Sequence, residues 1–338
     1  MDEPTREDSE KAHMSLMSLL RGYRAAQLLF VANRLGIFEA LTPQGARTDD
    51  LAAATGVPSD RLCHVLGALK GLGILDCFDG LYFVAPPYQA TLNPYSEDFL
   101  GSIVDSAAGE NTFWSLFAAD ILRGEYNGPP YESEFLNANT IRQSLRNVEI
   151  SNRQTMSSVW PYLTEELRGL KRFLDVGGGH GSYSLGVLER VPGAEGQIFD
   201  IAEAIEYFRE QIADNPHASR MACIPGDARS LAYIAEFDLV FVNDLLVYFS
   251  LTDKREILLR ASRALMPGGH LVMVKISLDP DRGSPAFGAM FSINMAVTSL
   301  TGYLETDVEA VALCREVGLR EIRLHRLSTG RSLIIARK

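Results

Sequence analysis

A glycine-rich turn and the acidic residue that follows it are the part of this sequence best suited to bind a ligand. The segment 173–182 reads Phe-Leu-Asp-Val-Gly-Gly-Gly-His-Gly-Ser and joins a predicted buried strand, Arg172–Val176, to a helix predicted from Tyr183. Glycines in such a turn lack the β-carbon that keeps a ligand away from the backbone. The next predicted strand ends at Asp200, about 20 residues on, where a carboxylate can accept hydrogen bonds from ribose hydroxyls. The pattern therefore predicts a site for a nucleotide-like ligand.

The order of the downstream elements separates two classes of enzyme that use such a turn. The turn alone fits both NAD enzymes and S-adenosylmethionine (SAM) methyltransferases. The later elements are a strand ending at Ile224-Pro-Gly-Asp227, a strand over Phe237–Asn243, a helix from about Thr252 to Leu265, and Met266-Pro-Gly-Gly-His-Leu-Val-Met-Val274. This order resembles the class I SAM-dependent methyltransferases. From about His13 onward, the chain resembles the caffeic-acid and hydroxyindole type of small-molecule O-methyltransferase, including its bacterial natural-product members.

The resemblance implies that SAM is the cofactor and S-adenosylhomocysteine (SAH) the product. It implies that Asp175 meets the ligand amino group, directly or through water, and that the backbone contacts the amino-acid portion. The other implied contacts are Asp200 on the ribose, Asp227 on the adenine amine, and apolar packing on adenine. The implied cofactor-binding residues are Asp175, Gly177, Gly179, Asp200, Ile201, Asp227, Ala228 and Asn243.

The general base of the family is absent from this sequence. In the family, a His-Asp-Trp motif follows the fourth strand, and its histidine removes the acceptor hydroxyl proton while two acids orient it. Here Val247, Tyr248 and Phe249 occupy the motif, and the segment 239–267 contains no histidine. Lys275 falls at the first orienting acid, and Leu304 or Glu305 falls at the second.

Three accounts of catalysis are open. In the first, the acceptor hydroxyl ionises unaided, proximity suffices, and the Lys275 cation favours the anionic acceptor. In the second, Tyr248, Asn294, Glu305 or Glu149 acts as base or orienter. In the third, the protein is a SAM-binding pericyclase or hydroxylase that transfers no methyl group. For Lys275, Tyr248 and Asn294, snorkelling, packing or helix capping is an equally good explanation.

Composition restricts the partners and the compartment. The chain has 338 residues, a hydrophobic share of 46% and a net charge of −11, which argues against a nucleic-acid partner. Its four cysteines are scattered without metal-ligand spacing, and its histidines form no cluster, so no metal site is predicted. The polar, acidic start is not a signal peptide, and no apolar run approaches a membrane span. The sequence predicts a cytoplasmic protein with no membrane partner.

The N-terminal part has the pattern of a winged helix. A disordered tail is predicted over 1–12 and a long periodic helix over Met14–Leu41. Two shorter helices follow, Thr48 to Gly56 and Pro58–Leu72, and then a two-stranded wing over Leu75–Val84 that turns at Asp79-Gly80.

Such a module could bind DNA or hold two subunits together. A DNA-binding module needs a basic recognition helix, and here the second short helix carries only Arg61 and Lys70 as cations. The resemblance implies that the module intertwines two subunits, so a homodimer is expected. Unspecific DNA binding at low salt would contradict this expectation.

The predicted fold is α/β, with a seven-stranded, mostly parallel Rossmann-like sheet implied by the resemblance. The expected parts are an all-helical winged-helix-like dimerisation domain over 13–100, connecting helices over 101–162, and the SAM-binding domain over 163–338. Aromatic residues in 111–117 and Phe135 could line a pocket or form inter-helix core, as could Met290 and Met295 on a helix over Ala286–Leu300. The expected activity is O-methylation of a small aromatic or heteroaromatic hydroxyl in specialised metabolism.

Overall fold

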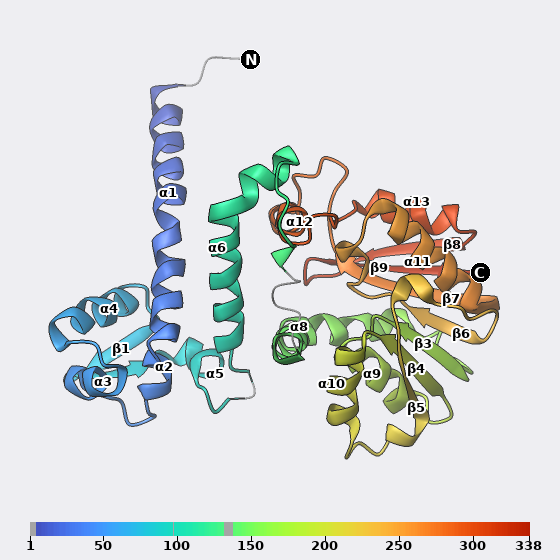
Figure 1. The fold of residues 1–338 in the computed structure, drawn as a ribbon, viewed down its shortest axis with the longest axis horizontal. Coiled ribbons are helices and arrows are strands. Elements are labelled where there is room, and N and C mark those ends of the chain that lie inside the picture. The colour runs from blue at the N-terminus through green and yellow to red at the C-terminus, as the bar shows by residue number, and fades with distance from the viewer. Residues whose placement is uncertain (1–4, 97, 132–137) are drawn as a thin grey trace. The chain divides into compact units, whose positions relative to one another are not determined.

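The structure is a computed structural model that describes residues 5–96, 98–131 and 138–338, so Phe135 lies outside the described residues (Figure 1). The chain divides into two compact units, Met1–Thr112 and Phe113–Lys338. The division falls inside helix α6 (Gly101–Arg123), so the predicted connecting segment 101–162 is shared between both units. Within the described residues, no helix is both long and apolar enough to cross a membrane.

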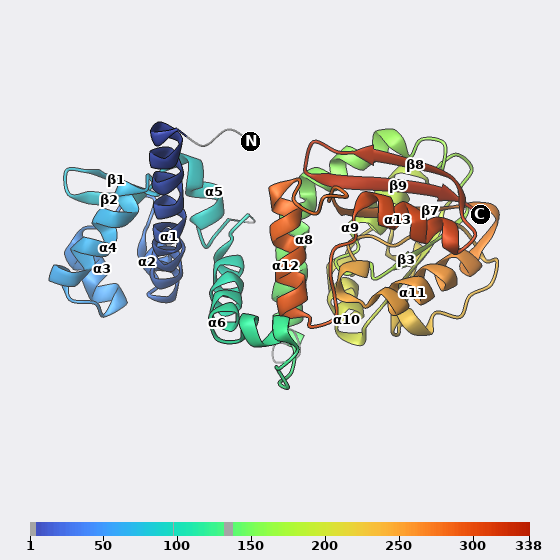
Figure 2. The same cartoon turned by 90° about the horizontal axis from the view of Figure 1, so that it is seen from above.

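Unit 1 has the predicted winged-helix arrangement. In both views, α3, α4 and the hairpin β1–β2 lie on the same side of α1 (Figures 1 and 2). Apolar side chains from all of these elements form one core, which includes Phe38, Leu51, Leu66 and Leu75. The elements are α1 (Arg6–Arg34), α2 (Ile37–Ala40), α3 (Thr48–Thr55), α4 (Ser59–Gly71), β1 (Leu75–Phe78), β2 (Leu81–Val84), a 3-10 turn (Pro86–Tyr88) and α5 (Gln89–Leu92).

The first helix starts earlier and ends earlier than the sequence predicts. Residues from Arg6 onward are helical, where the prediction places a disordered tail up to residue 12. Thr5 and Asp8 form a capping box, in which the Thr5 hydroxyl accepts from the Asp8 backbone N–H at 3.2 Å and the Asp8 carboxylate accepts from that of Thr5. This cap provides hydrogen-bond acceptors for backbone N–H groups at the start of the helix, which in a disordered tail would be bonded to water. At the other end, Gly36 adopts a left-handed conformation, φ 71°, and starts α2.

Unit 2 contains the seven-stranded sheet that the sequence predicts. The strand order is β5-β4-β3-β6-β7-β9-β8, and the first five strands are parallel. Strand β9 is antiparallel to both of its neighbours. The strands are β3 (Arg172–Val176), β4 (Glu195–Asp200), β5 (Met221–Pro225), β6 (Phe237–Phe241), β7 (Leu265–Ile276), β8 (Arg320–Arg326) and β9 (Arg331–Arg337).

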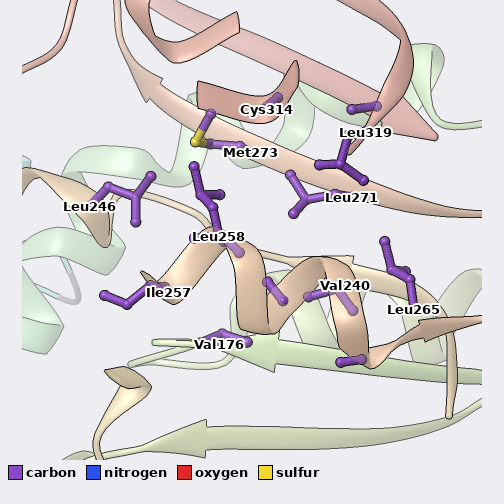
Figure 3. Packing of buried hydrophobic residues seen from close by; sticks show 14 of the residues in the cluster. Val176, Val240, Leu246, Ile257, Leu258, Leu265, Leu271, Met273, Cys314 and Leu319 are labelled. Carbon is purple, nitrogen blue, oxygen red and sulfur yellow. The ribbon is translucent and has the colours of Figure 1, made fainter. Parts of the chain in front are cut away.

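Helices cover both faces of this sheet, and the alternation of side chains along each strand decides which helices a residue meets. Leu239 and Phe241 of β6 pack with α8 and α9, whereas Val240 packs with α11 and α13. Figure 3 shows Ile257 and Leu258 of α11 on the second face. The helices are α8 (Ala138–Val159), α9 (Ser182–Arg190), α10 (Ala202–Ile212), α11 (Leu251–Ala264), α12 (Ala286–Thr298) and α13 (Asp307–Glu316), with 3-10 turns at Trp160–Tyr162, Ala218–Arg220, Ala228–Ser230 and Leu246–Tyr248.

The strand order places a ligand crevice at the carboxyl ends of β3 and β6. From β3 the chain continues to β4 on one side, and from β6 it continues to β7 on the other. Open α/β sheets bind ligands outside the carboxyl ends of the strands at such a switch point. The residues that follow Val176 and Phe241 are therefore the ones that this fold presents to a ligand.

Candidate active site

The turn after β3 is shaped for close approach to the backbone. Gly177 and Gly181 both have left-handed backbones, with φ of 68° and 72°. A β-carbon on Gly181 would lie 1.9 Å from the ring of Phe208, and one on Gly177 would lie 2.6 Å from the side chain of Leu245. The left-handed backbone and these close neighbours both favour glycine at the two positions. The sequence analysis predicts glycine here for ligand approach and does not predict these side-chain contacts.

Asp200 connects the end of β4 to this turn. Its carboxylate accepts hydrogen bonds from the backbone N–H groups of Gly179, at 2.8 Å, and Ile201, at 2.7 Å. Burial raises the pKa of Asp200, and these two hydrogen bonds oppose the shift. Each carboxylate oxygen keeps a lone pair after these bonds, so the side chain can still accept from ribose hydroxyls.

Asp175 is a buried carboxylate below the turn. It is 1% exposed, and the Ser184 hydroxyl donates to it at 2.7 Å. Burial raises the pKa of Asp175 to about 7. A ligand ammonium placed beside this carboxylate would stabilise its charged form, because an opposite charge offsets the loss of solvation. This matches the amino group that the resemblance assigns to Asp175.

The adenine end of the predicted site contains an ion pair that the sequence analysis does not predict. Arg229 donates to the carboxylate of Asp227 from Nη2 at 2.5 Å and from Nε at 3.0 Å, and it lowers the pKa of that carboxyl. An adenine amine would therefore share Asp227 with a guanidinium group. Ile201 is 41% exposed, whereas Ala228 is buried.

The position of the missing histidine is surrounded by hydrocarbon. Val247 is buried in an apolar cluster with Ile276, Leu278, Met295 and Leu304. A proton acceptor at this position would be poorly solvated in its charged form. The structure thus shows an apolar environment at the position to which the resemblance assigns the acid–base group.

Lys275 and Glu305, which the resemblance places at or near the positions of the orienting acids, each form an ion pair. The Lys275 ammonium donates to Asp307 at 3.1 Å and to the carbonyl of Ile276 at 2.7 Å. The Lys254 ammonium donates to Glu305 at 2.7 Å, and both side chains are almost completely buried. Lys275 and Glu305 are therefore already paired, which weakens the predictions that Lys275 stabilises the acceptor anion and that Glu305 orients a base.

The other predicted catalytic residues lie in different surroundings. Tyr248 is 43% exposed. The side-chain oxygen of Asn294 accepts from the Trp114 indole at 2.7 Å. Glu149, on α8, forms a hydrogen bond with Tyr207 on α10. Their catalytic roles stay hypotheses.

The predicted aromatic lining is mainly core. Phe113 is buried against Phe117, Tyr126 and Tyr131, with ring centroids 5.2–5.8 Å apart. Of the two methionines on α12, Met295 is buried and Met290 is 65% exposed.

His180 belongs to the glycine turn, and its side chain is buried. Its Nδ1 lies 2.8 Å from the hydroxyl of Ser182 and accepts from the Ser182 backbone N–H at 3.2 Å. Burial lowers the pKa of His180 to about 4, so the imidazole is neutral at pH 7. The contacts between His180 and Ser182 stabilise the turn.

A polar cluster beside the turn was missed by sequence reasoning. Asp244 comes directly after Asn243, and its carboxylate accepts from the Arg331 guanidinium and from the Asn152 amide, the latter at 3.2 Å. Arg331 also donates to the Asn152 oxygen at 2.6 Å. The three residues lie far apart in the chain, and the position of Asp244 at a strand end was the one available signal.

Comparison with known proteins decides the family. Residues 129–320 match the model of the O-methyltransferase domain, and residues 17–95 match that of the O-methyltransferase dimerisation domain. The chain belongs to this O-methyltransferase family. It is a SAM-dependent methyltransferase, and the fold expected from the resemblance is confirmed.

Relatives of this O-methyltransferase include bacterial natural-product enzymes and animal acetylserotonin O-methyltransferases. The chain is 26% identical over 322 residues to the 3-hydroxy-5-methyl-1-naphthoate 3-O-methyltransferase of Streptomyces sahachiroi, covering 93% of this chain and 91% of that protein. It is also similar to an O-methyltransferase family protein from Burkholderia thailandensis, with a TM-score of 0.86, 26% identity, and coverage of 96% and 97%. The structure of PigF with SAH has a TM-score of 0.86 at 21% identity, covering 99% of this chain and all of that one.

The residues at the turn fit the cofactor of the family. When bound, SAM supplies an electrophilic methyl group on a positively charged sulfur. The buried Asp175 lacks a cationic partner among the described residues and suits an ammonium group. The Asn243 amide nitrogen is buried and has no hydrogen-bond partner among the described residues, so it has a donor to offer.

We expect SAH to bind more weakly as the pH falls below 7. Asp175 has a raised pKa of about 7 without ligand, so above this pH the carboxylate is already charged and binding is at full strength. Below it, binding an ammonium releases a proton, and the dissociation constant should rise by up to about tenfold per pH unit. Calorimetry between pH 5.5 and 8.5 would measure this.

The control for this prediction is Asp175→Asn, which keeps the shape and removes the titrating group. This variant should bind SAH more weakly at pH 8 and lose most of the dependence on pH. A wild-type affinity that is constant from pH 5.5 to 8.5 would contradict the role of Asp175.

Proposed function

We propose that this enzyme methylates a hydroxyl on a small aromatic or heteroaromatic natural-product intermediate, without the histidine base of the family. The observation that carries the proposal is a complete cofactor turn, with Asp175 and Asp200, on the same sheet edge as a buried hydrocarbon cluster around Val247. Holding the acceptor near the methyl group and excluding water would supply most of the rate enhancement. The naphthoate O-methyltransferase relative supports an aromatic hydroxyl as the acceptor.

Within this proposal, each cofactor-binding residue has a defined role. Asp175 binds the amino group, and the backbone at Gly177 and Gly179 follows the amino-acid portion. Asp200 accepts from the ribose hydroxyls. Asn243 is fixed by a hydrogen bond from the Val274 N–H to its side-chain oxygen at 2.8 Å, and its amide nitrogen, which has no partner among the described residues, donates to the ligand. Ile201 and Ala228 pack on adenine, and Asp227 receives the adenine amine.

We also propose that the enzyme is a cytoplasmic homodimer formed through unit 1. This unit matches the dimerisation domain of the family. Residues 14–23 of α1 include five large apolar side chains that are each more than half exposed in the single chain: Met14, Leu16, Leu19, Leu20 and Tyr23. An apolar stripe of this kind marks an interaction surface.

Methyl transfer is tested with methyl-labelled SAM and a panel of hydroxynaphthoates, phenols and heteroaromatic hydroxyls. We expect SAH and labelled product to appear in equal amounts by mass spectrometry, because each transfer produces one of each. Asp200→Asn should raise the KM for SAM. Rearrangement of an acceptor without SAH formation would instead establish a non-methylating enzyme of this fold.

Restoring the histidine should not improve the enzyme. In Val247→His, the imidazole would enter an apolar cluster, and Glu305 is already paired with Lys254 and Asp307 with Lys275, so neither of these acids is free to orient it. We expect kcat to stay equal or fall, and the melting temperature to drop. Val247→Leu is the control for volume. A rise of kcat by orders of magnitude in Val247→His would show that the enzyme needs this base.

Charges on α1 should separate the subunits. We expect the double variant Leu19→Glu/Leu20→Glu to sediment as a monomer of 37.2 kDa, because the two carboxylates would be buried at the subunit contact. Ala53→Glu/Ala54→Glu, which adds the same charge to the exposed surface of α3, should stay dimeric. A wild-type protein that is monomeric at micromolar concentration would disprove the proposed assembly.

A further inference from the structure

Asp244 lies just beyond the carboxyl end of strand β6, beside the cofactor turn. It follows β6 at the switch point, and its N–H donates to the carbonyl of Val274 at 2.8 Å. The next residue, Leu245, lies against the turn, at the spot that a β-carbon on Gly177 would reach. The segment that carries Asp244 therefore packs directly against the backbone that approaches the cofactor.

The backbone at Asp244 has an uncommon conformation. Its φ is 49°, in the left-handed region that few non-glycine residues adopt. Aspartate tolerates this region better than most residues, yet the conformation is rare enough that it often marks a functional position. Here it directs the carboxylate toward α8 and β9.

The contacts of Asp244 hold its carboxylate without using all of its hydrogen-bonding capacity. Arg331 donates to Oδ1, and Asn152 donates to Oδ2 at 3.2 Å. A carboxylate offers about four lone-pair positions, so each oxygen can accept another hydrogen bond. The side chain is 24% exposed, whereas the Asp175 carboxylate is closed off. Of the two carboxylates, Asp244 is therefore the one that is open to solvent.

A second observation concerns the Tyr183 hydroxyl. The Tyr183 hydroxyl is buried and has no hydrogen-bond partner among the described residues. Burial raises the pKa of Tyr183, the charges of Asp244 and Asp175 raise it further, and the charge of Arg331 lowers it. An unpartnered buried hydroxyl is costly, so a bound group that hydrogen-bonds to Tyr183 would offset this cost.

From this geometry we infer that Asp244 is the proton acceptor of the enzyme, replacing the absent histidine three residues later in the chain. The inference rests on the proposed function and names the group that the function leaves unassigned. The acceptor hydroxyl gives its proton to the Asp244 carboxylate while its oxygen bonds to the methyl carbon. The carbon–sulfur bond breaks, and its electron pair stays on sulfur. The protonated Asp244 then returns its proton to water.

The charges around Asp244 suit this role. Burial raises the pKa of Asp244, while Arg331 of β9, Lys275 of β7 and the Asn152 amide of α8 oppose the shift. The carboxyl is therefore a better proton acceptor than an exposed aspartate. Arg331 also holds the carboxylate in one orientation, which a general base needs.

Asp244→Asn tests the inference, because an asparagine keeps the shape and can still accept from Arg331. Against a series of phenols of decreasing acidity, we expect kcat to fall at least about 100-fold for the weakest acids and much less for the strongest, since acidic phenols need little help to ionise. SAH affinity and melting temperature should stay within about twofold and a few degrees of wild type. Asp238→Asn, at the amino end of the same strand, is the matched control.

Carbon NMR of labelled aspartate carboxyls gives a readout that is independent of turnover. The Asp244 signal is the one lost in Asp244→Asn, or in Asp244→Glu should the first variant not fold. We expect it to titrate above the ordinary value of about 3.9 and to shift when a phenol is added to the SAH complex. A midpoint below this value would show a purely structural ion pair and overturn the inference, as would equal rates for Asp244→Asn and wild type. A wild-type enzyme that binds SAH but methylates no phenol would count against the proposed function, and the titration would still decide the role of Asp244.

Discussion

The close approach between the glycine turn and its neighbours is the constraint on which the rest of the site depends. Phe208 packs where a side chain on residue 181 would have to lie, and Leu245 does the same at residue 177. These contacts fix the turn from both sides, through α10 and through the segment after β6. The turn also holds the Asp200 side chain in place, because the Gly179 N–H donates to its carboxylate. The cofactor contacts and the polar cluster at Asp244 thus share one rigid support.

The acidic and basic groups of the catalytic unit have been redistributed relative to the family pattern. Lys275, at a position where the resemblance implies an orienting acid, is paired with Asp307, and Glu305 is paired with Lys254. Val247, at the position that the resemblance assigns to the histidine, lies in an apolar cluster. Breaking a buried ion pair leaves an uncompensated charge, which costs about 3–5 kcal/mol. Changing one residue back to the family's type would therefore leave its partner without a counter-charge. The ion pairs are stable only when both members of each pair are present. The acid–base function needs another location, and the strand end at Asp244 provides one.

Local patterns allowed much of this fold to be predicted. The range of β3 follows from a short apolar run, and the end of α3 follows from Gly56, which stops the helix. Both signals can be read from neighbouring residues in the sequence. The start of α1 was placed too late, because the capping box at Thr5 counts for more than the polar composition around it. The partners of Lys275 and Asp244 could not be predicted, since they lie 32 and 87 residues away in the chain, on α13 and on β9. Side-chain pairing over such separations depends on tertiary structure.

The insertion of β9 between β7 and β8 has a consequence for the synthesis of the protein. Arg331 belongs to β9, which pairs with β7 along seven residue positions and gives β8 its neighbour in the sheet. While the chain emerges from the ribosome, the glycine turn and Asp244 are present long before Arg331. The nascent chain thus holds a carboxylate without its guanidinium partner and a sheet that still has an open edge at β7. When β9 pairs with β7, Arg331 reaches Asp244 and the aggregation-prone edge of the sheet is covered in the same late step of folding.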